Sequence, residues 1–258
     1  MAIKPILFNT EMVRAILDGR KTCTRRVIKP QPQSRLCYTY AGSHKSCIGK
    51  WTYPNKGAHE FWGEEYKLPE NITDEELSKR WNPPYHTDDI LYVRETWCGW
   101  YLPLVGMHYC YRATEPDGNK RPTSQEYDCD MEKISWHPSI HMPKEAARIW
   151  LNVTDVRVER LQAITEDGAK ADGMPDSLDY PVDKEYCPLC KGEGIIGTVD
   201  VHSLGHMDVD CPYCDSYRKR FENLWNSINQ KHLDRYGWDE NPWVWVIEFE
   251  RCEKPKEV

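Results

Sequence analysis

The chain has 258 residues, 40% of them hydrophobic, and predicts a folded globular protein of one large or two small domains. Its net charge of −7 argues against broad binding to duplex DNA, which needs an extended basic face. No apolar run reaches the length of a membrane span and no signal-peptide core is present, so we expect a cytoplasmic protein without a membrane partner.

The first predicted elements are a strand and a short amphipathic helix. Residues 3–8 form an apolar run that favours a strand. Asn9 or Thr10 can cap the following helix, in which apolar side chains recur at helical spacing over residues 12–17. Gly19 stands where a helix C-cap belongs, because glycine enters the left-handed conformation without steric cost.

A dense group of positive charge follows this helix, and a strand is expected to begin within it, at Arg25. A local group of positive charges on an acidic chain, placed after a tight turn, is suited to binding a phosphate or another anion. A solvated cationic loop is the other interpretation of the same charges. The four cations are Arg20, Lys21, Arg25 and Arg26.

The spacing Gly19-x-Lys21-x-x-Thr24-x-Arg26 resembles the signature of the ASCH family, Gly-x-Lys-x-x-Glu-x-Arg, which belongs to the PUA-like β-barrels. Thr24 stands where the common pattern has Glu. One bacterial branch of the family, the N4-acetylcytidine amidohydrolases, has Gly-Arg-Lys-Thr-x-Thr at this place and uses the lysine and the second threonine in catalysis. The resemblance implies an α+β fold with a PUA-like barrel and flanking helices, and catalytic roles for Lys21 and Thr24.

Residues 31–86 show no sustained periodicity, so we interpret them as an insertion packed on the barrel. One helix is expected there, because Thr73 and Glu76 have the spacing of a capping box. A strand is predicted over residues 90–96 from its β-branched and aromatic content. Glu95, near the end of this strand, either points into the barrel cavity or pairs with a surface arginine.

Residues 98–145 are interpreted as a second irregular insertion, rich in aromatic side chains. Two of its histidines, His137 and His141, are candidate metal ligands or active-site groups, although packing is the more frequent role. Alternation of apolar and polar residues then predicts a long strand over residues 147–161, with a bulge near 154–155.

Thr165 is expected to begin a short helix that ends near Gly173. The resembling domains have a similar Leu-x-x-Ile-Thr-Glu helix after their long strand. In the amidohydrolase branch, the third catalytic residue is an acid on this helix. An ungapped alignment from Thr165 places that acid at Asp172, whose side chain is one methylene shorter than the glutamate of the family.

Two Cys-x-x-Cys pairs, 20 residues apart, lie within residues 175–215 and predict a zinc ribbon. A closed shell of four thiolates leaves no position for a reactive water, so we expect a structural Zn²⁺ that folds the ribbon. His202 and His206 are spare candidates should one cysteine not ligate. The predicted ligands are Cys187, Cys190, Cys211 and Cys214.

The C-terminal part is predicted to contain a helix within residues 216–235 and a final strand over residues 243–250. The resemblance covers the chain in pieces and is most similar to large ASCH-type proteins of bacteriophages and prophages. The barrel is expected to consist of residues 1–30, 87–97, 146–174 and 216–250. The three insertions are residues 31–86 and 98–145, packed on the barrel, and the ribbon 175–215.

Three functions stay open at this point. In the first, the protein hydrolyses an amide on a modified base such as N4-acylcytosine, with Lys21 as general base and Thr24 as nucleophile. Asp172 or Glu95 would orient the lysine or protonate the leaving amine. The neighbouring arginines Arg20, Arg25 and Arg26 would hold the substrate.

In the second, the same pocket binds RNA or a modified base without chemistry, and affinity falls with salt. In the third and weakest, the protein cleaves RNA, with His137 and His141 as general acid and base. The hydroxyl of Thr24 favours the hydrolase, because a reader of phosphates or bases needs no hydroxyl three residues after the lysine. A purely structural motif, which only closes the barrel, is the remaining interpretation.

Overall fold

The structure of the protein is a computed structural model. It describes residues 2–40, 47–54, 71–102, 106–114, 135–175, 190, 195–199, 206–211 and 216–256.

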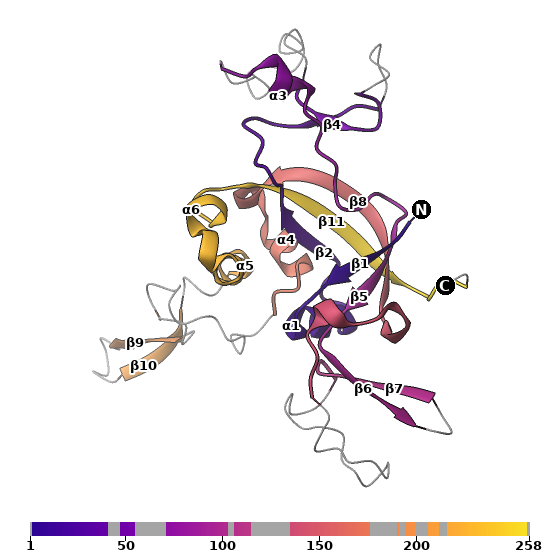
Figure 1. Ribbon diagram of the computed structural model, residues 1–258. Helices are drawn as coiled ribbons and strands as arrows, with labels where there is room; N and C mark the ends of the chain where they lie inside the picture. The colour runs from indigo at the N-terminus through magenta and orange to yellow at the C-terminus, as the bar shows by residue number, and fades with distance from the viewer. Residues whose placement is uncertain are drawn as a thin grey trace.

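A five-stranded mixed sheet forms the centre of the molecule (Figure 1). From one edge to the other, its strands are β1 (Ile3–Leu7), β5 (Ile90–Arg94), β8 (Trp150–Arg160), β11 (Trp243–Cys252) and β2 (Cys23–Val27). β1 and β5 run parallel, and every other pair of neighbours in this sheet is antiparallel. The α+β class predicted from the sequence is therefore confirmed.

The helices are short, and α4, α5 and α6 gather on the side of the sheet where β2 lies (Figure 1). The predicted C-terminal helix is split, because the chain leaves the helical conformation at Asn229. Among the described residues, no helix has the length and apolar content of a membrane span. The α-helices are α1 (Thr10–Leu17), α3 (Asp74–Ser78), α4 (Glu166–Ala171), α5 (Tyr217–Ile228) and α6 (Leu233–Tyr236). Turns of 3-10 helix are η4 (Ser139–His141), η5 (Lys144–Ala146), η6 (Leu161–Ala163) and η7 (Gln230–His232).

In the described part of the chain, three two-stranded hairpins project from this centre (Figure 1). One of them lies largely within residues 98–145, so this segment, which was predicted to be irregular, contains a regular hairpin. The hairpin strands are β3 (Cys37–Tyr38) with β4 (Trp51–Thr52), β6 (Trp97–Leu102) with β7 (Gly106–Tyr111), and β9 (Ile195–Val199) with β10 (His206–Asp210).

The helix ends form where the sequence predicts them. The side chain of Asn9 accepts a hydrogen bond of 2.8 Å from the N–H of Met12 and so caps α1. Gly19 has a φ of +76° just past the other end. Thr73 and Glu76 make the expected capping box at α3.

The two longest strands, β8 and β11, pair along their length and curve across the molecule (Figure 1). Glu248 pairs with Asp155, and the next residue of β11, Phe249, pairs with Val153. Thr154 is therefore the extra residue of a β-bulge, which confirms the bulge predicted in this strand.

The sheet is open between its two edge strands, and this differs from the predicted closed barrel. Within the described residues, no backbone pairing joins β1 to β2. One side chain of β2 crosses the gap, and Tyr85, from the end of the first insertion, reaches β1 beside it. The guanidinium of Arg26 donates to the carbonyl of Leu7 at 2.9 Å, and the hydroxyl of Tyr85 donates to the carbonyl of Pro5 at 2.8 Å. We call this bridged gap the seam.

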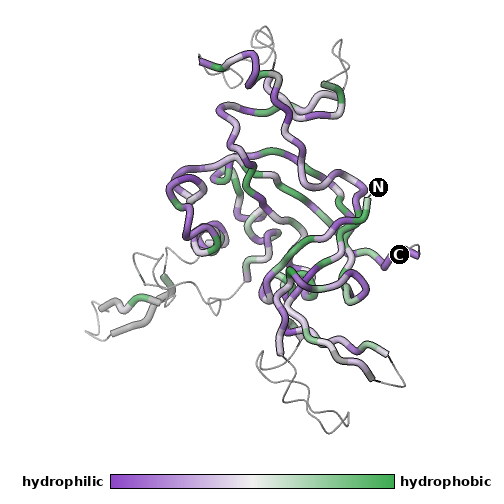
Figure 2. Tube along the Cα trace, viewed as in Figure 1, coloured by the Kyte–Doolittle hydropathy of each residue, from purple (hydrophilic) through white to green (hydrophobic). Residues whose placement is uncertain are grey.

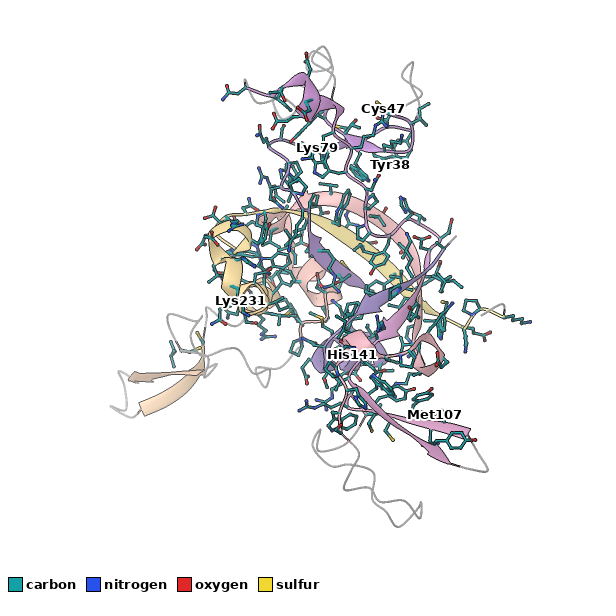
Figure 3. The ribbon with its side chains drawn as sticks, in the orientation of Figure 1. Tyr38, Cys47, Lys79, Met107, His141 and Lys231 are labelled. Atoms are coloured by element: carbon teal, nitrogen blue, oxygen red, sulfur yellow. The ribbon has the colours of Figure 1, made fainter. Side chains whose placement is uncertain are left out.

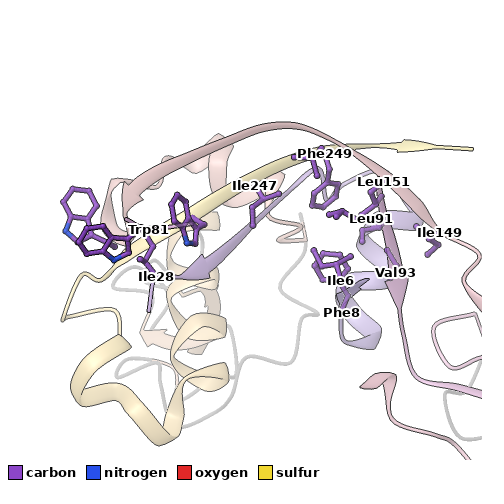
Figure 4. Close-up of a cluster of buried hydrophobic side chains, with 14 of the residues drawn as sticks. Ile6, Phe8, Ile28, Trp81, Leu91, Val93, Ile149, Leu151, Ile247 and Phe249 are labelled. Atoms are coloured by element: carbon purple, nitrogen blue, oxygen red, sulfur yellow. The ribbon is translucent and has the colours of Figure 1, made fainter. Parts of the chain in front are cut away.

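The main hydrophobic core lies under the curve of the sheet (Figure 4). Leu91, Val93 and Leu151 are fully buried there, and the hydrophobic colour in Figure 2 follows these central strands. The first insertion contributes to the same core, because Trp81 is buried in it and Trp51 packs edge-on against Trp245, at 5.6 Å between ring centroids.

Candidate active site

The motif loop between α1 and β2 is held by backbone bonds from three elements. After the turn at Gly19, the N–H of Lys21 donates to a carbonyl of α1 at 2.9 Å. The N–H of Thr22 donates to the carbonyl of Ala171 in α4, and its own carbonyl accepts from Phe249 of β11, each at 2.9 Å. These bonds fix the loop against the end of α4.

Lys21 and Asp172, 151 residues apart in the chain, form a buried ion pair. The Nζ of Lys21 lies 2.7 Å from Oδ1 of Asp172, and the two side chains are 0% and 5% exposed. Nζ also donates to the backbone carbonyls of Asp172 at 2.7 Å and of Cys23 at 2.8 Å. An ammonium has three N–H donors, so Lys21 donates all of them to these oxygens.

The other carboxylate oxygen of Asp172 accepts from Arg25. Nη1 of Arg25 lies 2.6 Å from Oδ2, and Nη2 lies 3.7 Å from Glu159. The guanidinium carbon is 5.7 Å from the ring centroid of Phe221. Nε of Arg25 is buried and has no hydrogen-bond partner in the described part of the chain, which leaves one donor of this group for a ligand.

The short side chain of Asp172 reaches the motif loop because α4 ends very close to it. Thr165 caps the start of α4, and Asp172 occupies its C-cap. Gly173 follows with a φ of +97°, and a Cβ at this position would lie 3.0 Å from the Cβ atoms of both Ala15 and Lys21. Only glycine allows this approach without displacing its neighbours.

A pocket of about 380 Å³, which we call the motif pocket, opens beside this ion pair. It is lined by residues 24–27 of β2, by Met12 of α1, by Lys29, by Asp172 and by one face of α5. Thr24 is 2% exposed, and its hydroxyl makes no hydrogen bond to a residue that the structure describes. A hydroxyl without a partner at the wall of a pocket is free to meet a ligand.

The opposite wall of the motif pocket is apolar and comes from α5. Phe221, Leu224, Trp225 and Ile228 line it. Their helical spacing was visible in the sequence, but the helix could not be assigned to the site. Ile228 continues the apolar stripe and is 55% exposed in the structure, so the stripe extends beyond what the core covers.

Positive charge gathers at the end of the motif pocket beyond Thr24. Arg26 and Lys29 line this end, and neither has an ion pair with a described carboxylate. Burial lowers the pKa of Arg26, against the opposing effects of Tyr85 and Asp172. Lys29 continues the run of cations in the sequence but was not among the predicted site residues.

Cys23 lies next to Lys21 and Arg25 but is not an activated nucleophile. Burial, with the nearby charge of Asp172, raises the pKa of its thiol to about 12. Thr24 is therefore the better candidate for a nucleophile in this loop.

Glu95 was predicted either to point into the barrel cavity or to pair with an arginine, and the structure has the pairing. Both of its carboxylate oxygens accept from Arg148 at 2.9 Å, and Glu95 is 1% exposed. The guanidinium of Arg148 stacks at 4.0 Å over Tyr111, whose pKa burial raises to about 12. Glu95 does not line the motif pocket.

The remaining predicted site residues also lie outside the motif pocket. Arg20 donates to the carbonyl of Gly173 at 2.8 Å and to Asp18 at 3.0 Å, which ties the loop to α4. His137 pairs with the backbone of Trp97 beside the β6–β7 hairpin, and His141 is exposed on η4 (Figure 3). The structure therefore does not bring the histidines to the basic loop.

Two of the four predicted zinc ligands, Cys187 and Cys214, lie outside the described residues. Cys190 and Cys211 are buried, at 5% and 0% exposure. Cys211 directly follows the last residue of β10, which pairs with Ile195 at the start of β9. Among the described residues, no group of three potential ligands is gathered to hold a metal ion.

Comparison with known proteins does not assign a family or a function to this site. A scan against protein-family models, a search of curated proteins and a search of solved structures each found no match to this chain.

Proposed function

We propose that this protein is an amidohydrolase that removes the acyl group from an N4-acylated cytosine or cytidine. The observation that carries the proposal is the buried contact of 2.7 Å between Lys21 and Asp172 beside the motif pocket. These are the residues at which the resembling enzymes have their catalytic lysine and acid. Thr24, the third residue of that set, lines the same pocket.

We further propose that the fold is a PUA-like ASCH domain. The rolled sheet supports this, because Arg26 of one edge strand reaches the carbonyl of Leu7 on the other. The position of the motif between α1 and β2 also agrees with the family. This protein would then differ from a closed barrel at the seam, where side-chain contacts replace hydrogen bonds between strands.

The reaction begins with two proton transfers. Lys21 passes a proton to Asp172 and becomes a neutral amine. The amine takes the proton of the Thr24 hydroxyl, whose oxygen attacks the carbonyl carbon of the amide. Nζ donates to the carbonyl of Cys23, which is bonded to the nitrogen of Thr24, so the lysine is held beside the backbone of the proposed nucleophile.

The carbon–nitrogen bond then breaks, and Asp172 returns its proton to the departing N4 of cytosine. The products of this step are a free cytosine amino group and an acyl ester on Thr24. Water attacks the ester with the same proton relay, so that Lys21 takes a proton of the water and Asp172 protonates the oxygen of Thr24. A free carboxylic acid leaves, and the resting ion pair is restored.

The unpartnered Nε of Arg25 gives this reaction a donor for developing negative charge. It is a buried donor of a residue that lines the motif pocket, and it has no acceptor among the described residues. The carbonyl oxygen of the amide gains charge as Thr24 attacks, and a fixed donor in a buried site stabilises that charge. Arg25 would therefore contact the substrate with Nε while its Nη1 orients Asp172.

A chromatographic assay tests the proposal. Purified protein is incubated with N4-acetylcytidine and with longer N4-acylated cytidines and cytosines, and release of cytidine or cytosine is followed. Thr24→Val removes the hydroxyl without changing the shape of the side chain, and Thr22→Val is the matched control at an exposed position of the same loop. We expect release by the wild type and by Thr22→Val, and none by Thr24→Val. No release from any substrate by folded protein would refute the hydrolase.

A second candidate function has its own observation. Lys21 donates all three of its protons to oxygens in the resting structure, as a lysine does in a static binding site. A module that binds a modified base or RNA needs no mobile proton, and its affinity would fall as salt rises. Salt-dependent binding of RNA without release of cytidine would favour this function.

We also propose that Cys187, Cys190, Cys211 and Cys214 hold one structural Zn²⁺. The burial of Cys190 and of Cys211, which directly follows β10, supports this. Such a metal would supply folding energy to the ribbon and no step of the reaction. We expect one zinc per chain by elemental analysis, and clearly less in Cys211→Ser. Wild-type protein refolded with and without zinc should differ in protection of β9 and β10 from hydrogen exchange.

A further inference from the structure

A second pocket, of about 500 Å³, lies between the first insertion and β8. Four aromatic side chains, Tyr38, Tyr40, Trp51 and Tyr85, line it, and we call it the aromatic pocket. Figure 3 shows Tyr38 in the part of the molecule built by the first insertion, well apart from Lys231 beside α5. Nothing in the proposed reaction uses this pocket.

The aromatic rings are arranged to accept another flat ring. Tyr40 packs edge-on against Tyr38, with 4.9 Å between ring centroids, and Tyr38 contacts Trp51 at 5.3 Å. Tyr40 is 84% exposed, so its ring is available to a ligand. Stacking of an unpaired base on such a ring is favourable for every base, because each base has a π-face.

The charges beside the aromatic pocket disfavour a phosphate. Arg157 lines it, but three carboxylates hold this one cation: Glu248 at 2.5 Å, Glu159 at 2.6 Å and Asp155 at 2.9 Å. His86 is the other titratable side chain of basic character in the lining. The cluster carries an excess of negative charge, so the pocket suits an uncharged base and not the sugar–phosphate backbone.

The aromatic pocket and the motif pocket meet at the seam. Tyr85 lines the first and Arg26 lines the second. Each donates to a carbonyl of β1, at Pro5 and Leu7, two residues or about 7 Å apart along a strand. The charge of Arg26 also acts on Tyr85, lowering its pKa against the larger, opposite effect of burial. Arg26, one cation of the motif pocket, thus lies beside the aromatic pocket at the seam.

We propose that the ligand is a single-stranded polynucleotide that crosses the seam. The acylated cytosine enters the motif pocket, the adjoining phosphate lies at Arg26 and Lys29, and a neighbouring base stacks on Tyr40. This inference rests on the proposed function for the identity of the modified base. It does not depend on catalysis, because binding of the strand uses the aromatic pocket and the seam.

The test compares binding of three unmodified probes to the full-length protein: cytidine, cytidine 5′-monophosphate and a fluorescein-labelled cytidylate hexamer, in ribose and deoxyribose forms. Tyr40→Ala removes the stacking ring, and Tyr101→Ala is the matched control, since Tyr101 is 66% exposed on the β6–β7 hairpin. We expect the wild type to bind a hexamer more tightly than the monophosphate. Tyr40→Ala should weaken that binding about 5- to 150-fold, and Tyr101→Ala should not change it.

A second pair of variants tests the phosphate contact. Lys29→Gln should bind the monophosphate less tightly and reduce its advantage over cytidine, whereas Lys231→Gln, an exposed lysine outside both pockets, should keep it. Equal hexamer binding by Tyr40→Ala and Tyr101→Ala would overturn the inference, as would a hexamer that binds no better than the monophosphate. Tyr40-dependent binding without release from any acylated substrate would refute the hydrolase and support the strand-binding surface. The ribose and deoxyribose arms identify RNA or DNA as the ligand.

Discussion

Asp172 is the residue on which the site depends, because its two carboxylate oxygens accept from two different cations. Lys21 occupies one oxygen at 2.7 Å and Arg25 the other at 2.6 Å. The pair with Lys21 follows from the motif and from the alignment at Thr165. The contact with Arg25 does not, since alternation along β2 places Arg25 on the opposite face from Thr24. It forms because α4 packs over that face.

Gly173 is expected to be indispensable for two reasons, its positive φ and the lack of space for a Cβ. Gly19 has only the first of them, so a comparison of the two glycines separates their effects. Both have a positive φ, but only at Gly173 would a Cβ meet other atoms, at 3.0 Å. Gly19→Ala should lose about 1–2 kcal/mol of unfolding free energy from backbone strain alone. Gly173→Ala should lose more and should also lower the rate of deacylation, because it moves Asp172 away from Lys21. Urea unfolding and the deacylation assay measure the two effects, and equal losses for both variants would contradict this account.

Cys23 is expected to resist alkylation in the folded protein. Its pKa of about 12, against an ordinary value of 9.0, leaves about a thousandfold less thiolate at pH 8. Iodoacetamide labelling followed by peptide mass spectrometry should modify Cys23 in urea but not under native conditions. Rapid native labelling at Cys23 would mean that this thiol, and not only Thr24, must be considered as the nucleophile.

At the scale of elements, helix ends were the most predictable features. Asn9, Gly19 and Thr165 each mark an end that the structure has, because capping is decided by local hydrogen bonds. The β6–β7 hairpin was missed, since the sequence between Leu102 and Gly106 holds no Asn-Gly or Asp-Gly pair to mark a tight turn. Whether such a hairpin forms depends on contacts between residues that lie far apart in the sequence.

The start of β1 is tied to the start of β5 by Asp89, which gives a pH-dependent prediction. Asp89 accepts from the N–H of Ala2, from the N–H of His86 and from Lys4 at 2.7 Å. Burial opposes ionisation, but these bonds prevail and lower the pKa of Asp89 below its ordinary 3.8. A lowered folded-state pKa stabilises the fold above the unfolded pKa, and this contribution is lost as pH falls through the folded one.

Asp89→Asn should therefore lose about 2–3 kcal/mol of unfolding free energy at pH 7. The difference in unfolding free energy between Asp89→Asn and the wild type should shrink as the pH drops below 3.8 and approaches the pKa of Asp89 in the folded protein. Denaturant unfolding at a series of pH values measures this difference. A loss that stays the same over the whole series would show that the charge of Asp89 is not its cause.

At the scale of the whole molecule, the order of strands in the sheet could not be predicted from the sequence pattern. β1 pairs with β5 although more than 80 residues separate them, and alternation within a strand carries no information on its partner. The seam was equally unpredictable, because it depends on Arg26 and Tyr85 meeting carbonyls of β1 after the sheet has curved. The contact of Lys21 with Asp172 was expected from the motif and from the alignment at Thr165, whereas the wall that α5 gives the motif pocket was not.

The most direct test of the central claim is the rate of cytidine release from N4-acetylcytidine by Asp172→Asn. Asp167→Asn, an exposed position on the same helix, is the control. If the pair of Lys21 and Asp172 moves the protons of the reaction, Asp172→Asn should lose about 10²- to 10⁴-fold in kcat, while Asp167→Asn keeps the wild-type value. A folded Asp172→Asn protein that releases cytidine as fast as the wild type would contradict the account.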